Sequence, residues 1–181
     1  MIIGIIGTIG AGKGTVAEYL KQKGFKHFSA REYIVEEIKK RGLPINRASM
    51  NLVGESLRAE HGASYVIDQL YDRAVHAGGD AVIEAVRTTG EVDSLKSKGV
   101  AVIAIDADPR IRYERILIRK SATDHVSFEK FLFDEKRESL AKDPAQMNVP
   151  QCIVLADVVF YNDTDVQTLY KQIDQFLKMH A

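Results

Sequence analysis

The stretch Ile-Ile-Gly-Ile-Ile-Gly-Thr-Ile-Gly-Ala-Gly-Lys-Gly-Thr, residues 2–15, decides the fold. It opens with an apolar, β-branched run at residues 2–6, which predicts a buried strand. Glycines punctuate the next eight positions, and the apolar residues after Thr15 recur at the spacing of one helical face. We therefore expect a strand, a glycine-rich turn and a helix that begins near Lys13.

This order of elements is typical of a P-loop, in which backbone N–H groups and a helix N-terminus surround phosphate oxygens. Glycine is needed because the backbone approaches the phosphates closely and adopts positive φ. Lys13 is expected to reach the β- and γ-phosphates of ATP, and the Thr15 hydroxyl to help hold Mg²⁺. The alternative is a glycine-rich turn without a ligand. The predicted nucleotide-binding residues are Gly7, Thr8, Ile9, Gly10, Ala11, Gly12, Lys13, Gly14 and Thr15.

Length and composition place bounds on the class of protein. The chain has 181 residues, enough for a single domain with its own core, and a formal net charge of zero. Neutral charge gives no sign of a nucleic-acid or anionic-membrane surface, and Cys152, the only cysteine, rules out a disulfide. The start lacks a basic region, and residues 2–6 are too short for a signal or a membrane span. We expect a cytoplasmic protein, monomeric or homodimeric, without nucleic-acid or membrane partners.

The remaining pattern alternates strands and helices. Several strands are continuous apolar runs, which indicates a parallel sheet covered on both faces. Three successive helices at residues 30–77 form an insertion between the second and third strands. The sequence predicts a single α/β domain over residues 1–181, with a doubly wound five-stranded parallel sheet. Strands after the first are predicted at residues 25–28, 81–86, 100–105 and 158–161.

Helix starts are marked by capping residues. Ser29, Thr88 and Thr164 each precede Glu or Gln by three residues, which predicts capping boxes. Asn46 and Asp108 are further predicted N-caps. An amphipathic helix is expected at residues 127–140, with Phe128, Phe131 and Leu132 inside.

Ligands of such sheets bind beyond the carboxyl ends of the strands, where Glu84 and Arg87 lie. A carboxylate within an apolar strand is costly unless it is paired. Glu84 is therefore predicted to serve Mg²⁺, directly or through water, or to accept hydrogen bonds from neighbouring loops. Arg87 is predicted to hold an acceptor phosphate, with an exposed arginine at a helix start as the alternative.

The run Gly10-Ala11-Gly12-Lys13-Gly14-Thr15 resembles the loop of nucleoside monophosphate kinases, adenylate kinase in particular. Residues 84–91 resemble that family's segment Asp-Gly-Phe-Pro-Arg followed by Gln four residues on. The resemblance implies that Arg87 binds the acceptor phosphate. The acid lies one residue closer to the arginine than in the family, and Glu91 replaces the Gln that reads the acceptor base.

The same resemblance extends to the arginines further along the chain. Arg115 and Arg119, after the run at residues 105–108, look like the arginines of the helix that leads to the lid and contacts the donor nucleotide. A solvated basic face is the alternative. A short lid is then expected at about residues 120–127, while Arg137 is expected to be a surface residue. The acceptor would be bound by one of Arg31, Arg47 and Arg58 in the insertion, and His27 and His125 are interpreted as structural or surface residues.

A second resemblance concerns residues 155–163, which look like the C-terminal segment of dephospho-coenzyme A kinase. That family carries a catalytic Asp after its second strand, where this chain has only Glu32. The sequence thus predicts an ATP- and Mg²⁺-dependent kinase with Lys13, Arg87, Arg115 and Arg119 as catalytic residues. Its acceptor would be a small phosphorylated, nucleotide-like molecule, in the first place a nucleoside monophosphate. Dephospho-coenzyme A kinase and a non-catalytic ATP sensor are the alternatives.

Overall fold

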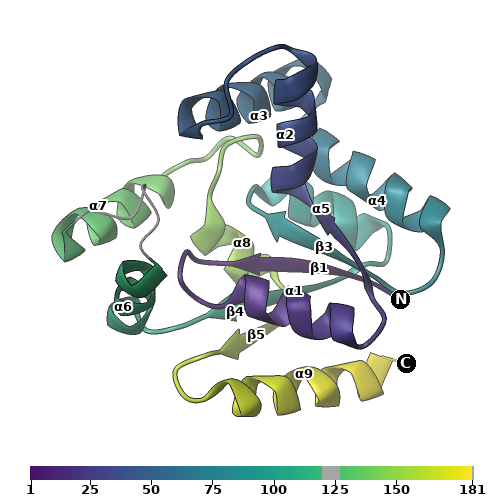
Figure 1. Cartoon of the computed structure of the whole chain (residues 1–181), viewed down its shortest axis with the longest axis vertical. Coiled ribbons are helices and arrows are strands. Elements are labelled where there is room, and N and C mark those ends of the chain that lie inside the picture. Colours follow the sequence, from purple (N-terminus) through teal and green to yellow (C-terminus); the bar gives the residue numbers. More distant parts are fainter. Residues whose placement is uncertain (120–126, 181) are drawn as a thin grey trace.

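The computed structural model describes residues 1–119 and 127–180 and centres on one parallel sheet. Its strand order is β2-β3-β1-β4-β5, and each neighbouring pair is parallel. The predicted fold class is confirmed, and Figure 1 shows the strands crossing the middle of the molecule with helices around them. The strands are Ile2–Gly7 (β1), Lys26–Ser29 (β2), Ala81–Val86 (β3), Ala101–Asp106 (β4) and Val158–Tyr161 (β5).

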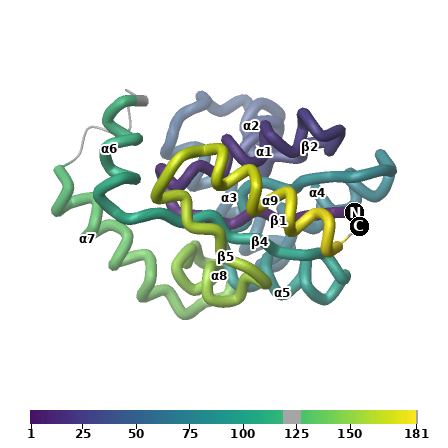
Figure 2. Tube along the Cα trace, turned by 90° about the horizontal axis from the view of Figure 1, so that it is seen from below, coloured from purple at the N-terminus to yellow at the C-terminus, as the bar shows by residue number. Residues whose placement is uncertain are grey.

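Two hydrophobic cores cover the two faces of the sheet, because side chains alternate along each strand. Ile3 and Ile5 of β1 pack with the apolar sides of α1 and α9, whereas Ile6 packs on the opposite face with α4, α5 and α8. Figure 2, a view from below, shows α1 on one side of the sheet and α5 and α8 on the other. Helices α1 to α9 span Lys13–Gln22, Ala30–Lys40, Arg47–His61, Tyr65–Ala77, Thr89–Ser97, Pro109–Arg119, Phe128–Glu138, Val149–Leu155 and Val166–His180.

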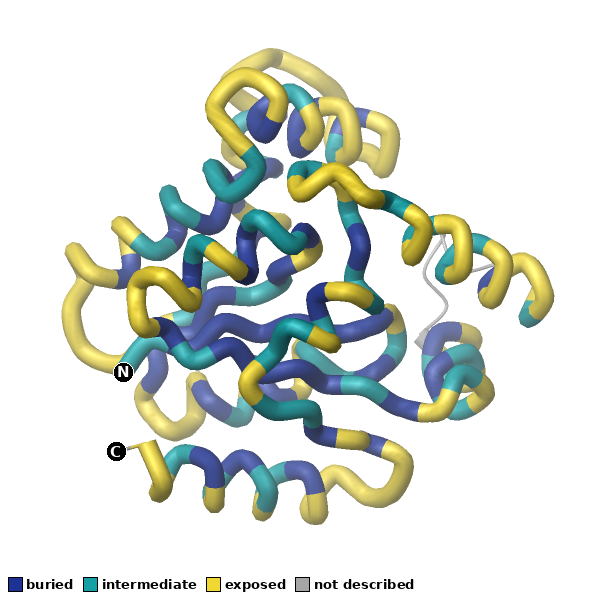
Figure 3. The backbone as a smooth tube through the Cα atoms, turned by 180° about the vertical axis from the view of Figure 1, so that it is seen from behind, coloured by how far each residue is buried: buried dark blue, intermediate teal, exposed yellow. Residues whose placement is uncertain are grey.

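Helices α2, α3 and α4 form the helical insertion (residues 30–77) between β2 and β3. Figure 1 shows α2 and α3 above the sheet and α6 and α7 to its left, with the end of β1 between them. In Figure 3 the central strands are buried, while the turn between α2 and α3 is exposed. The insertion is therefore attached to the sheet through its helices and not through that turn.

Most predicted helix starts are confirmed. Thr88 and Glu91 form a reciprocal capping box, and Ser29 and Asn46 accept the N–H groups of Glu32 and Ser49. Asp108 accepts the N–H of the second residue of α6 at 2.8 Å, as its place before Pro109 predicts.

Two predictions were wrong, and one helix was not predicted. Asp165, not Thr164, lies directly before α9, and its carboxylate accepts the Thr168 N–H at 3.0 Å. Leu132 is 38% exposed and not inside, because α7 buries only a narrow stripe that contains Phe131. Helix α8 was missed, although Asn148 caps it and Pro150 stands in its first turn.

None of the helices within the described part of the chain is both long enough and apolar enough to cross a bilayer.

The buried Cys152 gives a test of this packing. Its side chain on α8 is fully buried, and burial raises the pKa of the thiol to about 12. Because the thiolate is the reactive form, the native protein should react with a disulfide reagent at pH 8 only through unfolding, and the denatured chain at once. The rate of labelling of the native protein is the measurement. Complete labelling within seconds would contradict the position of α8.

Candidate active site

The turn between β1 and α1 forms a cradle that leaves no room for side chains. Gly10 and Gly12 have φ of +80° and +107°, the left-handed region that favours glycine. A Cβ atom on Gly10 would lie 2.5 Å from the Arg112 carbonyl oxygen, and one on Gly7 would lie 2.3 Å from the Ile105 carbonyl oxygen. A Cβ on Gly14, in contrast, would meet nothing within 4 Å. The cradle therefore requires glycine at the first three positions and not at the fourth.

Two side chains from elsewhere in the chain hold the carbonyl groups of this turn. Asn162 Nδ2, after β5, donates to the Ala11 carbonyl oxygen at 2.8 Å, and Arg112 Nη1, on α6, donates to that of Ile9 at 3.4 Å. In a trans peptide the C=O of one residue and the N–H of the next point in opposite directions. The N–H groups of Gly10 and Gly12 are thus directed away from these two anchors.

The first turn of α1 adds further donors, because its N–H groups have no partner within a helix. Thr15, the third residue of α1, is exposed there, as a hydroxyl ligand of a metal ion must be. Lys13 Nζ lies over the turn and donates to the Thr8 carbonyl oxygen at 2.9 Å. These residues fit the phosphates of a bound nucleotide in shape and in charge.

Glu84 lies on β3 and forms a hydrogen bond with His27 of the neighbouring strand β2. Its carboxylate accepts a hydrogen bond from His27 Nε2 at 2.9 Å, and both side chains are about one fifth exposed. That hydrogen bond, together with the charges of His27, Lys13 and Arg87, holds the pKa of Glu84 below its usual range, although burial acts the other way. This contact is consistent with the interpretation of His27 as a structural residue. Glu84 is therefore an anion close to the lysine of the cradle, and its role toward Mg²⁺ stays a prediction.

Arg87 directly follows β3. Hydrogen bonds hold its backbone, and its side chain is exposed. Its N–H donates to Glu91 Oε2 at 2.8 Å, and its carbonyl oxygen accepts the Asn148 N–H at 2.9 Å. The guanidinium contacts the sulfur of Met147, with Nη1 to Sδ at 3.9 Å. The positive charge of Arg87 is thus available to a ligand at the edge of the sheet.

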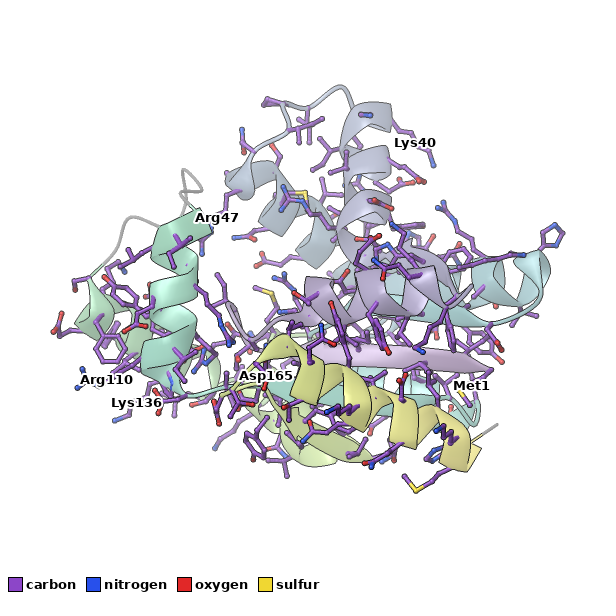
Figure 4. All side chains as sticks on the ribbon, turned by 60° about the horizontal axis from the view of Figure 1, so that its bottom comes forward. Met1, Lys40, Arg47, Arg110, Lys136 and Asp165 are labelled. Atoms are coloured by element: carbon purple, nitrogen blue, oxygen red, sulfur yellow. The ribbon has the colours of Figure 1, made fainter. Side chains whose placement is uncertain are left out.

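Glu91 and Arg58 differ from the expectations for them. Glu91, which the resemblance places at the base-reading position, is 1% exposed and accepts Arg58 Nε at 3.1 Å. Arg58 is itself 8% exposed, so its Nε serves this buried ion pair and not an acceptor. Of the three candidate arginines in the insertion, Arg31 and Arg47 are exposed. Figure 4 shows Arg47 on the outer part of the molecule, far from Met1.

Two arginines of α6 form contacts near the cradle: Arg112, which the sequence analysis missed, and Arg115, which it selected. Arg112 is 4% exposed, donates to the Ala107 carbonyl oxygen at 2.8 Å and forms a two-pronged ion pair with Glu135 of α7. Nothing in the sequence around Arg112, three residues after Pro109, indicates these contacts. Arg115 donates Nη2 to the Asn162 carbonyl oxygen at 2.8 Å, while its Nη1 is buried with no hydrogen-bond partner among residues 1–119 and 127–180.

Asn162, whose carbonyl oxygen Arg115 binds, is the residue that holds Ala11 of the cradle, and the role of Arg115 toward a nucleotide stays a prediction. Arg119 ends α6, and its side chain, the expected lid at residues 120–126 and His125 lie outside the described residues. Arg137 is exposed on α7, as expected.

A metal ion would have few protein ligands here. Within residues 1–119 and 127–180, no three His, Cys, Asp or Glu side chains gather closely enough to hold one. Mg²⁺ commonly binds through one or two protein groups together with phosphate oxygens and water, so this donor set fits Mg²⁺ bound with a nucleotide. Thr15 and Glu84 are the residues that would hold it, and the ion would neutralise charge on the phosphates.

Comparison with known proteins places the chain in a family and agrees with its fold. A family model described as an AAA domain matches residues 3–139. The chain belongs to this family. A UPF0200 protein of Pyrococcus abyssi is 30% identical over 185 residues, which cover 98% of this chain and 96% of that protein. A UPF0200 protein of Pyrococcus horikoshii is 29% identical over 182 residues, which cover 97% of this chain and 95% of that protein.

Solved structures show the same fold at low sequence identity. The shikimate kinase from Acinetobacter baumannii, in complex with shikimate, has a TM-score of 0.63 at 15% identity, with 99% of this chain and 93% of that chain covered. TT1252 from Thermus thermophilus has a TM-score of 0.66 at 20% identity, with 100% and 98% covered. The chain is a P-loop NTPase domain with the fold of small-molecule kinases.

Arg112 offers a test of the anchored cradle. Arg112→Lys keeps the charge but cannot reproduce the planar set of donors that reaches Ala107, Ile9 and Glu135. We expect the dissociation constant for Mg·ATP to rise about tenfold, the scale of one charge-assisted hydrogen bond. Calorimetric titration measures it, with Arg110→Lys, an exposed arginine on the same helix, as the matched control. Equal affinity in both variants would contradict the role of Arg112.

Proposed function

We propose that this protein is an ATP- and Mg²⁺-dependent kinase that transfers the γ-phosphoryl group to a small phosphorylated acceptor. The observation that supports it best is the placement of two cationic side chains after neighbouring strands. Lys13 lies over the turn that follows β1, and the exposed Arg87 follows β3, which pairs with β1. A nucleotide hydrolase needs only Lys13. The exposed guanidinium of Arg87, at the end of β3, suits a second phosphate group.

In this proposal each residue has a charge-neutralising or positioning role, since phosphoryl transfer needs little else from a protein. The cradle N–H groups and Lys13 bind the donor phosphates, and Thr15 and Glu84 hold Mg²⁺ directly or through water. Arg87 binds the acceptor phosphate, and Arg115 and Arg119 bind the donor nucleotide. Bound Mg²⁺ would supply charge neutralisation between the phosphates.

The helical insertion would bind the rest of the acceptor, with the exposed Arg31 and Arg47 as candidate contacts. Residues of about 120–127 would form a short lid that excludes water during transfer. A nucleoside monophosphate is the first candidate acceptor, from the likeness of residues 10–15 and 84–91 to those kinases. Dephospho-coenzyme A is the second, favoured by the segment at residues 155–163, in which Asn162 holds the cradle.

Lys13→Ala tests the donor site. Lys13 is only part-buried and its loss removes a charge from the transition state, so folding should be retained while transfer falls by at least about a hundredfold. The assay is ADP release with a panel of nucleoside monophosphates and dephospho-coenzyme A. Lys21→Ala, an exposed lysine on the same helix, is the control. Transfer by Lys13→Ala within tenfold of the wild type would exclude this site, and ATP binding without any acceptor-dependent turnover would favour the sensor.

Arg87→Lys tests the acceptor site. Lysine cannot form the two parallel hydrogen bonds of a guanidinium to a phosphate, so acceptor binding should weaken by about 1.5–3 kcal/mol while ATP affinity is unchanged. Paired titrations with ATP and with the best acceptor measure both. If ATP binding falls as far as acceptor binding, Arg87 belongs to the donor site. If neither changes, the acceptor carries no phosphate at this position.

A further inference from the structure

A buried carboxylate joins the helical insertion to the backbone of Arg87. Glu91 Oε2 accepts the N–H groups of Arg87 and Thr88 at 2.8 and 3.2 Å, and Oε1 accepts Nε of Arg58, on α3, at 3.1 Å. Burying a carboxylate that is 1% exposed costs free energy unless a cation and N–H groups surround it, as they do here. A single side chain thus connects α3, the start of α5 and the end of β3.

A second connection runs in parallel to the first. The Thr88 hydroxyl accepts the Glu91 N–H at 3.2 Å and donates to the Ala63 carbonyl oxygen, in the turn between α3 and α4, at 3.5 Å. A Cβ atom on Gly90 would lie 2.7 Å from the Ala63 Cβ, so the insertion approaches α5 as closely as the chain allows. The end of β3 and the insertion therefore form one packed unit.

The backbone of Arg87 is held at its N–H and at its carbonyl oxygen, while its guanidinium remains exposed. The N–H is bound by Glu91, and the carbonyl oxygen by the Asn148 N–H at 2.9 Å. A side chain that starts from an immobile backbone loses less conformational entropy when it binds a ligand. Its affinity therefore depends on the groups that hold its backbone.

We propose that the Arg58–Glu91 ion pair positions Arg87 for the acceptor phosphate and couples that arginine to the helical insertion. The inference rests on the proposed function, in which Arg87 binds that phosphate. Glu91 and Arg58 are positioning residues that do not touch the substrate. It follows that position 91 reads no base of the acceptor, which is recognised in this part of the site through its phosphate.

The test compares two variants with a matched control. Glu91→Gln keeps an oxygen for the N–H groups of Arg87 and Thr88 but presents an NH₂ group to Arg58, so the ion pair is lost. Arg58→Met removes the cation from the other side and keeps an extended apolar side chain. Glu36→Gln is the control, because Glu36 forms an exposed ion pair with Arg73 between α2 and α4 of the same insertion.

The Michaelis constants for the acceptor and for ATP are measured in each variant, with thermal unfolding alongside. We expect both variants to raise the acceptor KM about five- to fiftyfold, the range for residues coupled in one network, with the ATP KM within about twofold. The control should change neither constant. In an Arg87→Lys background, Glu91→Gln should raise the acceptor KM no further, because it acts through Arg87.

Three results would overturn the inference alone. In the first, the two Michaelis constants rise together, as in a general loss of structure. In the second, the effects of Glu91→Gln and Arg87→Lys multiply. If Arg87→Lys raises the acceptor KM and Glu91→Gln does not, the proposed function stands and the positioning role falls. A wild-type protein without any acceptor-dependent turnover would overturn the proposed function and this inference with it.

Discussion

The arrangement of the candidate site depends on two hydrogen bonds to the backbone of the glycine-rich turn. Asn162 and Arg112 bind the carbonyl groups of Ala11 and Ile9 from segments about 150 and 100 residues away in the chain. By fixing the carbonyl groups, they fix the opposite direction of the N–H groups that follow. The cradle is therefore a tertiary structure, held by the ends of β5 and α6, and not a property of residues 7–15 alone.

The same two residues connect the glycine-rich turn to other parts of the candidate site. Arg112 joins the cradle to α7 through Glu135, and Asn162 joins it to Arg115. On the other side, Glu91 joins Arg87 to α3. Glu84 lies on β3, which pairs with β1, and the charges of Lys13 and Arg87 both help to lower its pKa. The proposed donor and acceptor groups are thus held by different sets of contacts at the ends of two neighbouring strands.

Much of this could be predicted from the sequence, because the signals are local. The change from apolar run to glycines to helical spacing at residues 2–15 is visible without any partner, and so are the caps at Ser29, Asn46 and Thr88. The strands of the parallel sheet were predicted to within one residue, since several of them are continuous apolar runs between polar turns.

The contacts that hold the site could not be predicted, because they join distant segments. Arg112 and Asn162 carry no local pattern that separates them from exposed residues of the same type. Glu91 was correctly placed in a capping box, yet its second oxygen binds Arg58, which lies 33 residues earlier. His27 reaches Glu84 only because β2 and β3 are neighbours. Helix α8 is too short to show a helical period.

The central claim is that the backbone N–H groups of this cradle bind the phosphates of ATP. Amide ¹H–¹⁵N correlation spectra of the wild-type protein, titrated with Mg·ATP, test it most directly. The account predicts large shifts at Gly10, Gly12, Gly14 and Thr15, with protection of these N–H groups from hydrogen exchange in the complex. Unchanged resonances at these four residues, with shifts confined to another surface, would contradict it.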